Sequence, residues 1–445
     1  MPKITHRKKR LSSFKLIVLG FAGVIVLGAL ILMLPFSSTA GVVTPFHEAL
    51  FTSTSAVCVT GLVVQDTGSY WSAFGQTVIL LLIQIGGLGV VTVAALFAML
   101  SGRKISLMQR STMQDAISAP KVGGIVRLTR FIVRGTFLIE LIGMIVMLPT
   151  FCGNYGIKGI WMAAFHSVSA FCNAGFDILG TVENKYPSLT GYIGNPAINI
   201  TIMLLIIVGG IGFLTWDDIY TNKWHFKKYR MQSKVILVTT AILIIAPAVF
   251  FFFCDFTGLP LAERILASLF QSVTPRTAGF NTADLPAMTG SSKAIMTLLM
   301  LVGGSPGSTA GGMKTTTLAV LILSAFSVCR KKDDAEVCGR RIDGSTVKNA
   351  AAVAVMYFLL FFVGGIVIST AEGLPLSTCL YETASAVGTV GLTLGITPQL
   401  GVLSQLILIV LMYLGRVGGL TLIYAAVSNK NQSGAKLPLE KITVG

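Results

Sequence analysis

The sequence contains little charge for its length. Only 12% of its 445 residues are Asp, Glu, Lys or Arg, whereas 53% are hydrophobic, and the mean hydropathy is +0.79. Soluble domains usually carry about a quarter of their residues as charged side chains. This deficit, together with several apolar runs long enough to cross a bilayer, excludes a soluble globular protein and predicts an integral membrane protein.

The sequence also lacks the residue patterns of most enzymes and metal proteins. Its four histidines are far apart, and its seven cysteines are scattered without the spacing of a zinc site. It contains no nucleophile with a histidine partner and no cofactor fingerprint. We therefore expect neither an enzyme nor a metalloprotein.

Apolar runs predict eight full spans, because an apolar helix of about 20 residues crosses the hydrocarbon core. The first run is too long for the core of a secretory signal, and similar runs recur to the end of the chain. The predicted spans are Phe14–Leu34, Gln76–Leu100, Phe131–Pro149, Ile198–Leu214, Val235–Phe253, Ala294–Val328, Val353–Ile368 and Leu403–Val427.

Positive charge is concentrated in alternate loops. The formal net charge is +16, and most Lys and Arg residues lie at the N-terminus, in three loops and in the C-terminal tail. The positive-inside rule places these loops and both termini in the cytoplasm, together with Asp217 and Asp218 at the end of a span. The basic excess is therefore explained by topology, and it does not indicate a nucleic-acid partner.

A pattern of about 110 residues occurs four times, in "FTSTSAVCVTGLVV", "FHSVSAFCNAGFDI", "FQSVTPRTAGFNTA" and "YETASAVGTVGLTL". Each copy has an aromatic residue, a Ser/Thr/Ala-rich segment and then a glycine, and each is followed by a Gly-rich stretch such as "QIGGLGVVT". The four glycines are Gly61, Gly175, Gly279 and Gly391. The chain divides into a basic tail (1–13), repeats at 14–110, 111–234, 235–347 and 348–428, and a second tail (429–445).

The segment ahead of each glycine is too short to cross the membrane, so it must enter the bilayer and return. Non-helical backbone survives at that depth only where it is buried in protein or lines water. Carbonyl groups from four such segments around one axis replace the hydration shell of a cation, and the negative ends of four short helices favour one. The residues predict an all-α membrane protein in which four repeats of helix, re-entrant pore loop and helix surround one central cation pathway.

The stretch "GGSPGSTAGGMKTTT" (303–317) admits two interpretations. As a phosphate-binding loop it fails, because Met313 stands where lysine is needed and the stretch follows an apolar helix rather than a strand. As a break in a membrane helix it fits, because Pro306 removes a backbone donor and the glycines relax the backbone torsions. We expect no nucleotide to bind to this chain itself.

Other classes of membrane protein explain the pattern less well. A secondary active cation symporter with alternating access is the main alternative, although its repeats usually form two halves. No predicted span carries Arg or Lys at every third position, as a voltage sensor does. A receptor-like protein leaves the fourfold repeat unexplained.

These motifs resemble the Trk/Ktr/HKT superfamily of potassium transporters, and within it most closely the membrane subunit of bacterial Ktr systems (KtrB). The resemblance covers essentially the whole chain and rests on "CVTGL", "CNAGF", "RTAGF", "GTVGL", "GGSPGSTAGGMKTTT" and "LGRVGGLT". It implies that K+ binds to backbone carbonyls of a selectivity filter and that Gly61, where sodium-preferring plant relatives have Ser, favours potassium. The implied filter residues are Val59, Thr60, Gly61, Asn173, Ala174, Gly175, Thr277, Ala278, Gly279, Thr389, Val390 and Gly391.

The resemblance also implies a gate under the filter. Arg416 is then an electrostatic barrier that hydrogen-bonds carbonyls of the gate loop, whereas Lys314 either lines the gate or reaches the cytoplasmic interface. We expect these two residues to be the only cations at membrane depth, and Glu48, His166 and Glu382 on the pore helices to form structural hydrogen bonds or attract cations. The implied gate residues are Gly303, Gly304, Ser305, Pro306, Gly307, Gly311, Gly312, Lys314 and Arg416.

Further properties follow from the resemblance alone. It implies a homodimer in a bacterial plasma membrane, with the C-terminal tail at the dimer contact. It implies a cytoplasmic ring of nucleotide-binding regulatory subunits of the KtrA type on the basic loops. It implies, finally, that sodium stimulates transport.

Overall fold

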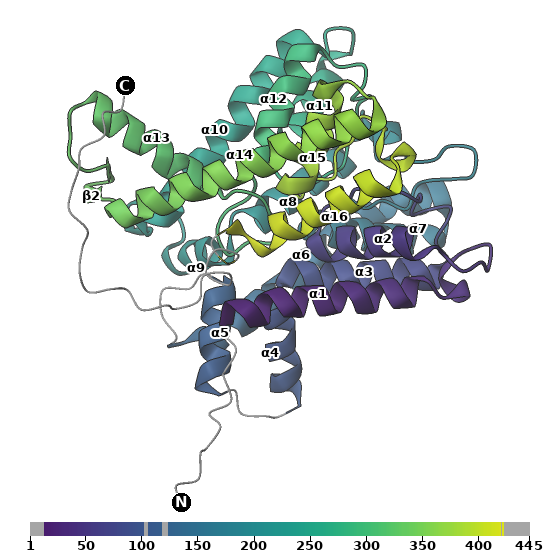
Figure 1. Ribbon diagram of the computed structural model, residues 1–445, viewed down its shortest axis with the longest axis horizontal. Helices are drawn as coiled ribbons and strands as arrows, with labels where there is room; N and C mark the ends of the chain where they lie inside the picture. The colour runs from purple at the N-terminus through teal and green to yellow at the C-terminus, as the bar shows by residue number, and fades with distance from the viewer. Residues whose placement is uncertain (1–12, 102–105, 118–122, 420, 422–445) are drawn as a thin grey trace, which may run out of the picture.

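A computed structural model describes residues 13–101, 106–117, 123–419 and 421. The N-terminal tail before Ser13 and the predicted C-terminal dimer contact lie outside the described residues. The described chain is almost entirely helical, with most helices running side by side in one bundle (Figure 1). This confirms the predicted fold class.

Each repeat has the same order of elements. A long first helix leads to a short pore helix, and a second helix in two parts or of limited length follows. The first helices are α1 (Ser13–Leu32), α6 (Ile125–Tyr155), α10 (Met231–Cys254) and α14 (Gly344–Glu372). The pore helices are α2 (Phe46–Cys58), α7 (Lys158–Phe171), α11 (Leu261–Val273) and α15 (Leu376–Gly388). The second helices are α3 (Ala73–Leu88) with α4 (Val90–Leu100), α8 (Pro196–Gly210) with α9 (Phe213–Asn222), α12 (Gly290–Leu301) with α13 (Thr315–Cys329), and α16 (Val402–Val417).

Length separates the helix types. Among the described helices, α1, α6, α10 and α14 are long and apolar enough to cross a membrane unaided. The number of spans rises to six if α3 with α4, and α8 with α9, are each counted as one span. The pore helices have 13 or 14 residues and so reach only about 20 Å at 1.5 Å per residue. They are too short to cross a hydrocarbon core of about 30 Å.

Besides Ala294–Val328, in which a break was expected, three predicted spans are not continuous helices. The chain bends by 99° between α3 and α4 and by 98° between α8 and α9, and α16 ends at Val417. We expected unbroken spans at Gln76–Leu100 and Ile198–Leu214, and this expectation was wrong. The end of the predicted span to Val427 lies outside the described residues. The breaks lie at Gly89, Gly212 and Gly418, whose φ values of 85°, 91° and 86° are accessible to glycine but strained for residues with a Cβ.

The repeats form a closed ring. Each pore helix packs against the second helix of the preceding repeat: α7 on α3, α11 on α8, α15 on α12, and α2 on α16. The last contact joins the fourth repeat to the first, so the ring has no open side. Each pore helix carries the aromatic residue of the repeat motif, and these four side chains (Phe51, Phe165, Phe270, Tyr381) are almost completely buried.

Several smaller elements lie at one end of the bundle. α4 and α5 (Leu107–Ile117) stand across the direction of α1 in Figure 1, close to the end of the bundle where α1 begins. A hairpin of β1 (Glu336–Val337) and β2 (Arg340–Arg341) follows α13 at the same end. The proposed repeat boundaries after residues 110, 234 and 347 fall inside α5, α10 and α14.

Candidate functional site

The backbone after each pore helix alternates between left-handed and ordinary torsions. Val59, Asn173, Thr277 and Thr389 are non-glycine residues with positive φ, between 52° and 66°. Two residues later the key glycine of each repeat again has positive φ, and the residue between them does not. Such alternation turns successive peptide groups in the same sense, so that a row of like dipoles faces one side.

The four glycines interlock around one axis. A Cβ added to Gly61 would lie closer than 3.0 Å to the carbonyl oxygen of Ala174, one residue before the next key glycine. The same is true from Gly175 to Ala278, from Gly279 to Val390 and from Gly391 to Thr60. The fourth contact returns to the first repeat, so the carbonyls of Thr60, Ala174, Ala278 and Val390 form a closed carbonyl ring that only glycine neighbours allow.

Hydroxyl groups hold the backbone behind this carbonyl ring. Ser55 accepts a hydrogen bond from the Gly61 N–H (3.1 Å), and Ser385 accepts one from the Gly391 N–H (3.0 Å). Ser169 and Thr274 instead donate to the carbonyls of Phe176 and Phe280. All four hydroxyls lie four residues after the aromatic of the motif, and this regular spacing is the sequence signal that our prediction missed.

The ring carbonyls themselves keep their acceptor capacity. Among the hydrogen bonds of the described residues, none is donated to the carbonyl oxygen of Thr60, Ala174, Ala278 or Val390. Buried carbonyls normally find a donor or a ligand. Four such oxygens facing one axis are suited to bind a cation without its water shell.

Glycines in the second helices let the pore helices approach closely. A Cβ on Gly86, Gly209 or Gly415 would overlap the carbonyl oxygen of Val57, Phe171 or Val387, respectively, at the C-terminal end of a pore helix. These positions correspond in the first, second and fourth repeats. The Gly-rich stretch after the first, second and fourth filters is therefore a docking surface for the pore helix.

The third repeat departs from this pattern. Its second helix stops at Leu301 and resumes at Thr315, and the twelve intervening positions after Val302 form the loop that contains the predicted gate. The two ends of the loop are joined, because the Gly303 N–H donates to Met313 O (2.7 Å) and the Thr315 N–H donates to Gly304 O (3.0 Å). The loop is thus a closed lobe rather than an open strand of chain.

The lobe is hydrogen-bonded to its neighbours on both sides. Ser305 N–H donates to Gly210 O in the second repeat (2.9 Å), and Phe213 N–H donates to Gly307 O (2.7 Å). On the other side Gly312 N–H donates to Gly415 O in the fourth repeat (3.2 Å). The breaks of the neighbouring helices therefore supply the partners of the loop backbone.

The lobe also contacts the filter directly. The hydroxyl of Thr309 lies 3.2 Å from Asn173 Oδ1, and the Asn173 amide donates to Arg276 O (3.2 Å). A Cβ on Gly311 would overlap the side chain of Thr389. Residues of the predicted gate loop and of the predicted filter, which lie far apart in the sequence, are thus brought into contact.

Two cationic side chains bind carbonyls of the lobe. The Arg416 guanidinium donates to Thr309 O and, on its other side, to Gly86 O of the first repeat. Lys314 Nζ donates to Ala310 O (2.7 Å) and Gly311 O (3.3 Å) rather than extending away from the lobe. Together with the backbone bonds, Arg416 links the lobe of the third repeat to all three others.

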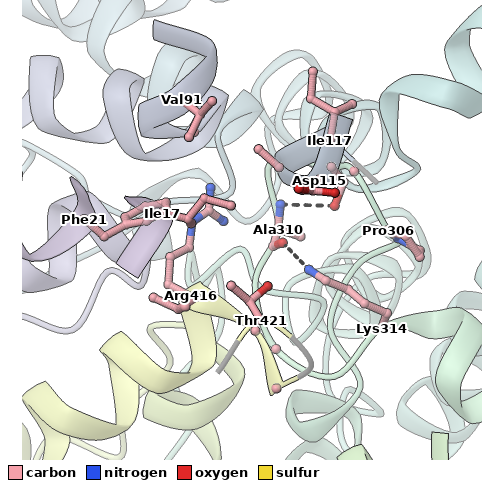
Figure 2. A pocket seen from close by; sticks show the side chains of 18 of the residues that line it. Ile17, Phe21, Val91, Asp115, Ile117, Pro306, Ala310, Lys314, Arg416 and Thr421 are labelled. Carbon is pink, nitrogen blue, oxygen red and sulfur yellow. Dashed lines mark hydrogen bonds between the residues drawn. The ribbon is translucent and has the colours of Figure 1, made fainter. Parts of the chain in front are cut away.

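A cavity of about 290 Å³ lies on the far side of the lobe from the filter. Figure 2 shows Arg416, Lys314 and Asp115 of α5 among the residues that line the cavity, with Lys314 reaching toward Ala310. Gly307 lies against the carbonyl of Ile117 at the end of α5. The cavity and the carbonyl ring are therefore separated by the lobe.

A third cation lies at membrane depth, contrary to our expectation of two. Arg276, directly before the third filter, is only 4% exposed. Its guanidinium donates to Thr240 Oγ1 on α10 (3.2 Å), while Nε has no hydrogen-bond partner and no carboxylate of the described residues forms an ion pair with it. The "RTAGF" motif contained this arginine, but its burial depends on the fold.

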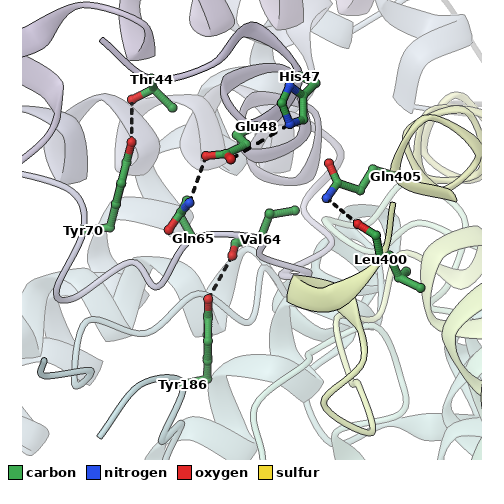
Figure 3. Close-up of polar contacts among 9 residues, drawn as sticks. All are labelled: Thr44, His47, Glu48, Val64, Gln65, Tyr70, Tyr186, Leu400 and Gln405. Atoms are coloured by element: carbon green, nitrogen blue, oxygen red, sulfur yellow. Dashed lines mark hydrogen bonds and ion pairs between the residues drawn. The ribbon is translucent and has the colours of Figure 1, made fainter. Parts of the chain in front are cut away.

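The segment after each filter forms a polar mouth. Gln65 donates to Glu48 (2.9 Å), and the Tyr186 hydroxyl donates to Val64 O (2.8 Å), as Figure 3 shows. Burial raises the pKa of Tyr186, and the negative charges of Asp66 and Glu48 raise it further. The carboxylates of Glu48 and Asp66 thus lie among the polar groups of this segment, and negative charge at the entrance of a pathway attracts cations.

The remaining predicted polar residues form structural contacts. His166 Nδ1 lies 2.8 Å from Met162 O, and Glu382 accepts from Thr397. Asp217 and Asp218 lie on α9 beyond the bend, where both pair with Arg230. None of these three contacts involves the carbonyl ring.

Comparison with known proteins decides the family. A model of the TrkH family, described as cation transport proteins, matches residues 13–434. The chain belongs to the TrkH family. The sequence is 39% identical over 98% of both chains to the potassium/sodium uptake protein NtpJ of Enterococcus hirae, and 37% identical to the Ktr system potassium uptake protein B of Bacillus subtilis, covering 97% of this chain and 96% of that one.

A solved structure agrees with the fold. The potassium transporter TrkH of Vibrio parahaemolyticus superposes with a TM-score of 0.74 at 19% identity, covering 96% of this chain and 87% of that chain. This TrkH-family chain is therefore a multi-pass membrane protein for cation transport, and it is not an enzyme.

Proposed function

We propose that this chain is the potassium-translocating membrane subunit of a Ktr-type uptake system. The relatives that it matches over nearly their whole length are named for potassium or for potassium and sodium uptake. K+ passes through the carbonyl ring, with Val59, Asn173, Thr277 and Thr389 at the inner side of the filter.

The observation that carries this proposal is the closure of the ring. Each of the four glycines excludes a Cβ because a carbonyl of the next repeat occupies that space. Helix packing does not require so close an approach of the four backbones, because Gly86, Gly209 and Gly415 already allow the pore helices to pack closely. The close approach places four carbonyl oxygens at one level around one axis, which is the geometry that replaces a hydration shell.

The lobe at 303–317 acts as the gate. It lies between the carbonyl ring and the 290 Å³ cavity, which is lined by the cationic side chains of Lys314 in the lobe and Arg416 in α16. In the closed state these charges repel a cation that leaves the filter, and movement of the lobe opens the path. The gate is single because, within the part of the chain that the structure describes, the third repeat alone inserts extra residues at the break.

Orientation and partners complete the proposal. The basic loops and both termini face the cytoplasm of a bacterial cell, by the positive-inside rule. Two copies form a homodimer on a ring of nucleotide-binding regulatory subunits, and sodium stimulates flux. The carbonyl groups of the ring fit a monovalent cation without water, and sodium acts elsewhere.

The test is cation flux into liposomes that contain the purified chain, with and without the regulatory ring. We expect potassium and rubidium flux far above sodium flux, reduced selectivity in Gly61→Ser, and faster flux after deletion of Pro306–Gly311. Flux that saturates and requires a second ion in a fixed ratio contradicts the pore and supports a symporter with alternating access. If the deletion speeds flux but Gly61→Ser does not change the selectivity, the assignment of the gate stands and Gly61 is not part of the filter.

A further inference from the structure

The end of α9 and the turn after it form an exposed aromatic and basic surface. We call residues Ile219–Lys228 the interfacial segment. Tyr220 is 73% exposed and Trp224 is 98% exposed, and Phe226 is also exposed. Lys223, Lys227 and Lys228 are exposed between them.

This exposure occurs on a well-fixed turn. Arg230 pairs with Asp217 (3.0 Å) and Asp218 (3.3 Å), and Ser233 donates to Asp218 at the start of α10. The Tyr229 hydroxyl donates to Lys223 O and closes the turn from inside. The fold therefore holds large aromatic side chains outward, although burying them would be favourable.

The position of the segment along the bundle follows from α6. The rings of Tyr220 and Phe131 lie 5.4 Å apart, so α9 crosses α6 near residue 131. Six residues further along α6, at about 9 Å by helix rise, the exposed side chains become apolar. These exposed side chains are Phe137, Leu138, Leu141, Ile142 and Ile145.

That change in surface marks the edge of the hydrocarbon core. Exposed arginines at 127, 130 and 134 lie on the first turns of α6, just before the apolar face begins. The headgroup layer on each side of a bilayer is roughly 5–8 Å thick. The edge of the core lies between Arg134 and Phe137, about 4.5–9 Å along α6 from Phe131, and this distance places Tyr220 and its neighbours at headgroup level.

We propose that the interfacial segment docks on anionic lipid headgroups of the adjacent leaflet. Aromatic rings with polar edges favour the membrane interface, and lysines beside them attract anionic lipid. No carboxylate in the described part of the chain pairs with Lys223, Lys227 or Lys228. A protein partner is the weaker match, because α9 leaves the membrane span at 98° and so runs along the membrane surface.

The docked segment is mechanically connected to the lobe. Phe213, the first residue of α9, donates its N–H to Gly307 O (2.7 Å), and Gly210 just before the bend accepts from Ser305 N–H (2.9 Å). Only two turns of helix separate these contacts from Tyr220. Lipid docking therefore fixes the helix on which part of the lobe is anchored.

Trp224 is a built-in probe of this docking. Of the four tryptophans, Trp71 and Trp216 are buried and Trp161 is half-buried, so Trp224 dominates the exposed emission. We would reconstitute the full chain in nanodiscs of phosphatidylcholine, with or without phosphatidylglycerol, and measure quenching by acrylamide and by a headgroup-nitroxide lipid. The signal that Trp224→Phe removes is assigned to Trp224.

In phosphatidylglycerol nanodiscs we expect acrylamide quenching of Trp224 to fall severalfold and nitroxide quenching to rise. The variant Lys223→Gln/Lys227→Gln/Lys228→Gln should lose this lipid dependence, since each lysine contributes about a fivefold preference for an anionic surface. The control Lys158→Gln/Lys185→Gln/Lys348→Gln, with the same loss of charge at exposed sites elsewhere, should keep it. Equal acrylamide quenching in both lipids overturns the proposal, and so does protection that appears only when the regulatory ring is added.

Discussion

Replacement of Gly391 by Ala, compared with Gly395→Ala, isolates the carbonyl ring from every other effect. Both glycines have strongly positive φ, 96° and 91°, in the same post-filter segment. Each substitution therefore carries the same backbone strain of about 1–2 kcal/mol. Only the Cβ at Gly391 overlaps the Thr60 carbonyl, whereas nothing lies within 4 Å of a Cβ at Gly395.

The magnitude follows from the overlap. To restore ordinary van der Waals contact, the Thr60 carbonyl must move by roughly 1 Å. Overpacking of this kind costs about 1–3 kcal/mol in addition to the shared strain. If widening the ring weakens its hold on a dehydrated ion by the same amount, the preference for potassium over sodium falls by about 5- to 150-fold.

The assay is rubidium and sodium uptake into liposomes, with thermal unfolding of both variants measured in the same lipid. We expect Gly391→Ala to lose selectivity and Gly395→Ala to keep it. The stability of Gly395→Ala should fall only by the backbone strain that both variants share. Equal selectivity in the two variants, with both folded, refutes the assignment of the ring carbonyls as the ion path.

Three further predictions use other contacts. Arg416→Gln removes charged hydrogen bonds to the carbonyls of Thr309 and Gly86, each of which contributes about 1.5–3 kcal/mol. Potassium flux through this variant should therefore rise at least about tenfold, whereas Arg330→Gln at an exposed site should leave the flux unchanged. An unchanged flux in Arg416→Gln contradicts the role of Arg416 as a restraint on the lobe. Gly86→Ala should lower the unfolding temperature because its Cβ overlaps Val57 O, whereas Gly23→Ala, with open space, should not; equal unfolding temperatures argue against the docking contact. Thr240→Val removes the side-chain partner of Arg276 and should cost about 1.5–3 kcal/mol in denaturant unfolding, whereas Thr370→Val on the exposed face of α14 should be nearly neutral.

The repeat order was predictable from sequence because glycine has few substitutes where backbones converge. Gly61, Gly175, Gly279 and Gly391 marked the four re-entrant segments, and hydropathy marked the long first helices. Both signals are local. The comparison with TrkH confirms the fold that they predicted.

The breaks in the second helices were not predicted because hydropathy continues through them. The stretches "GGLG" and "GGIG" contain Gly89 and Gly212, and "GRVG" contains Gly418, three residues after the glycine that docks the pore helix. That spacing was available in the sequence, but apolar residues on both sides concealed the turn. Burial of Arg276 was beyond sequence reasoning, since it depends on α10 packing against the third pore segment.

The carbonyl ring is assembled from four different stretches of one polypeptide. In a pore of four identical subunits, any substitution appears four times and changes the whole circumference at once. Here a substitution changes one quarter, and the positions two residues before the key glycines already differ: they hold Val59, Asn173, Thr277 and Thr389. The ring can therefore be adjusted in small, independent steps, and each quarter can acquire its own side-chain contact below it, as Asn173 has with Thr309.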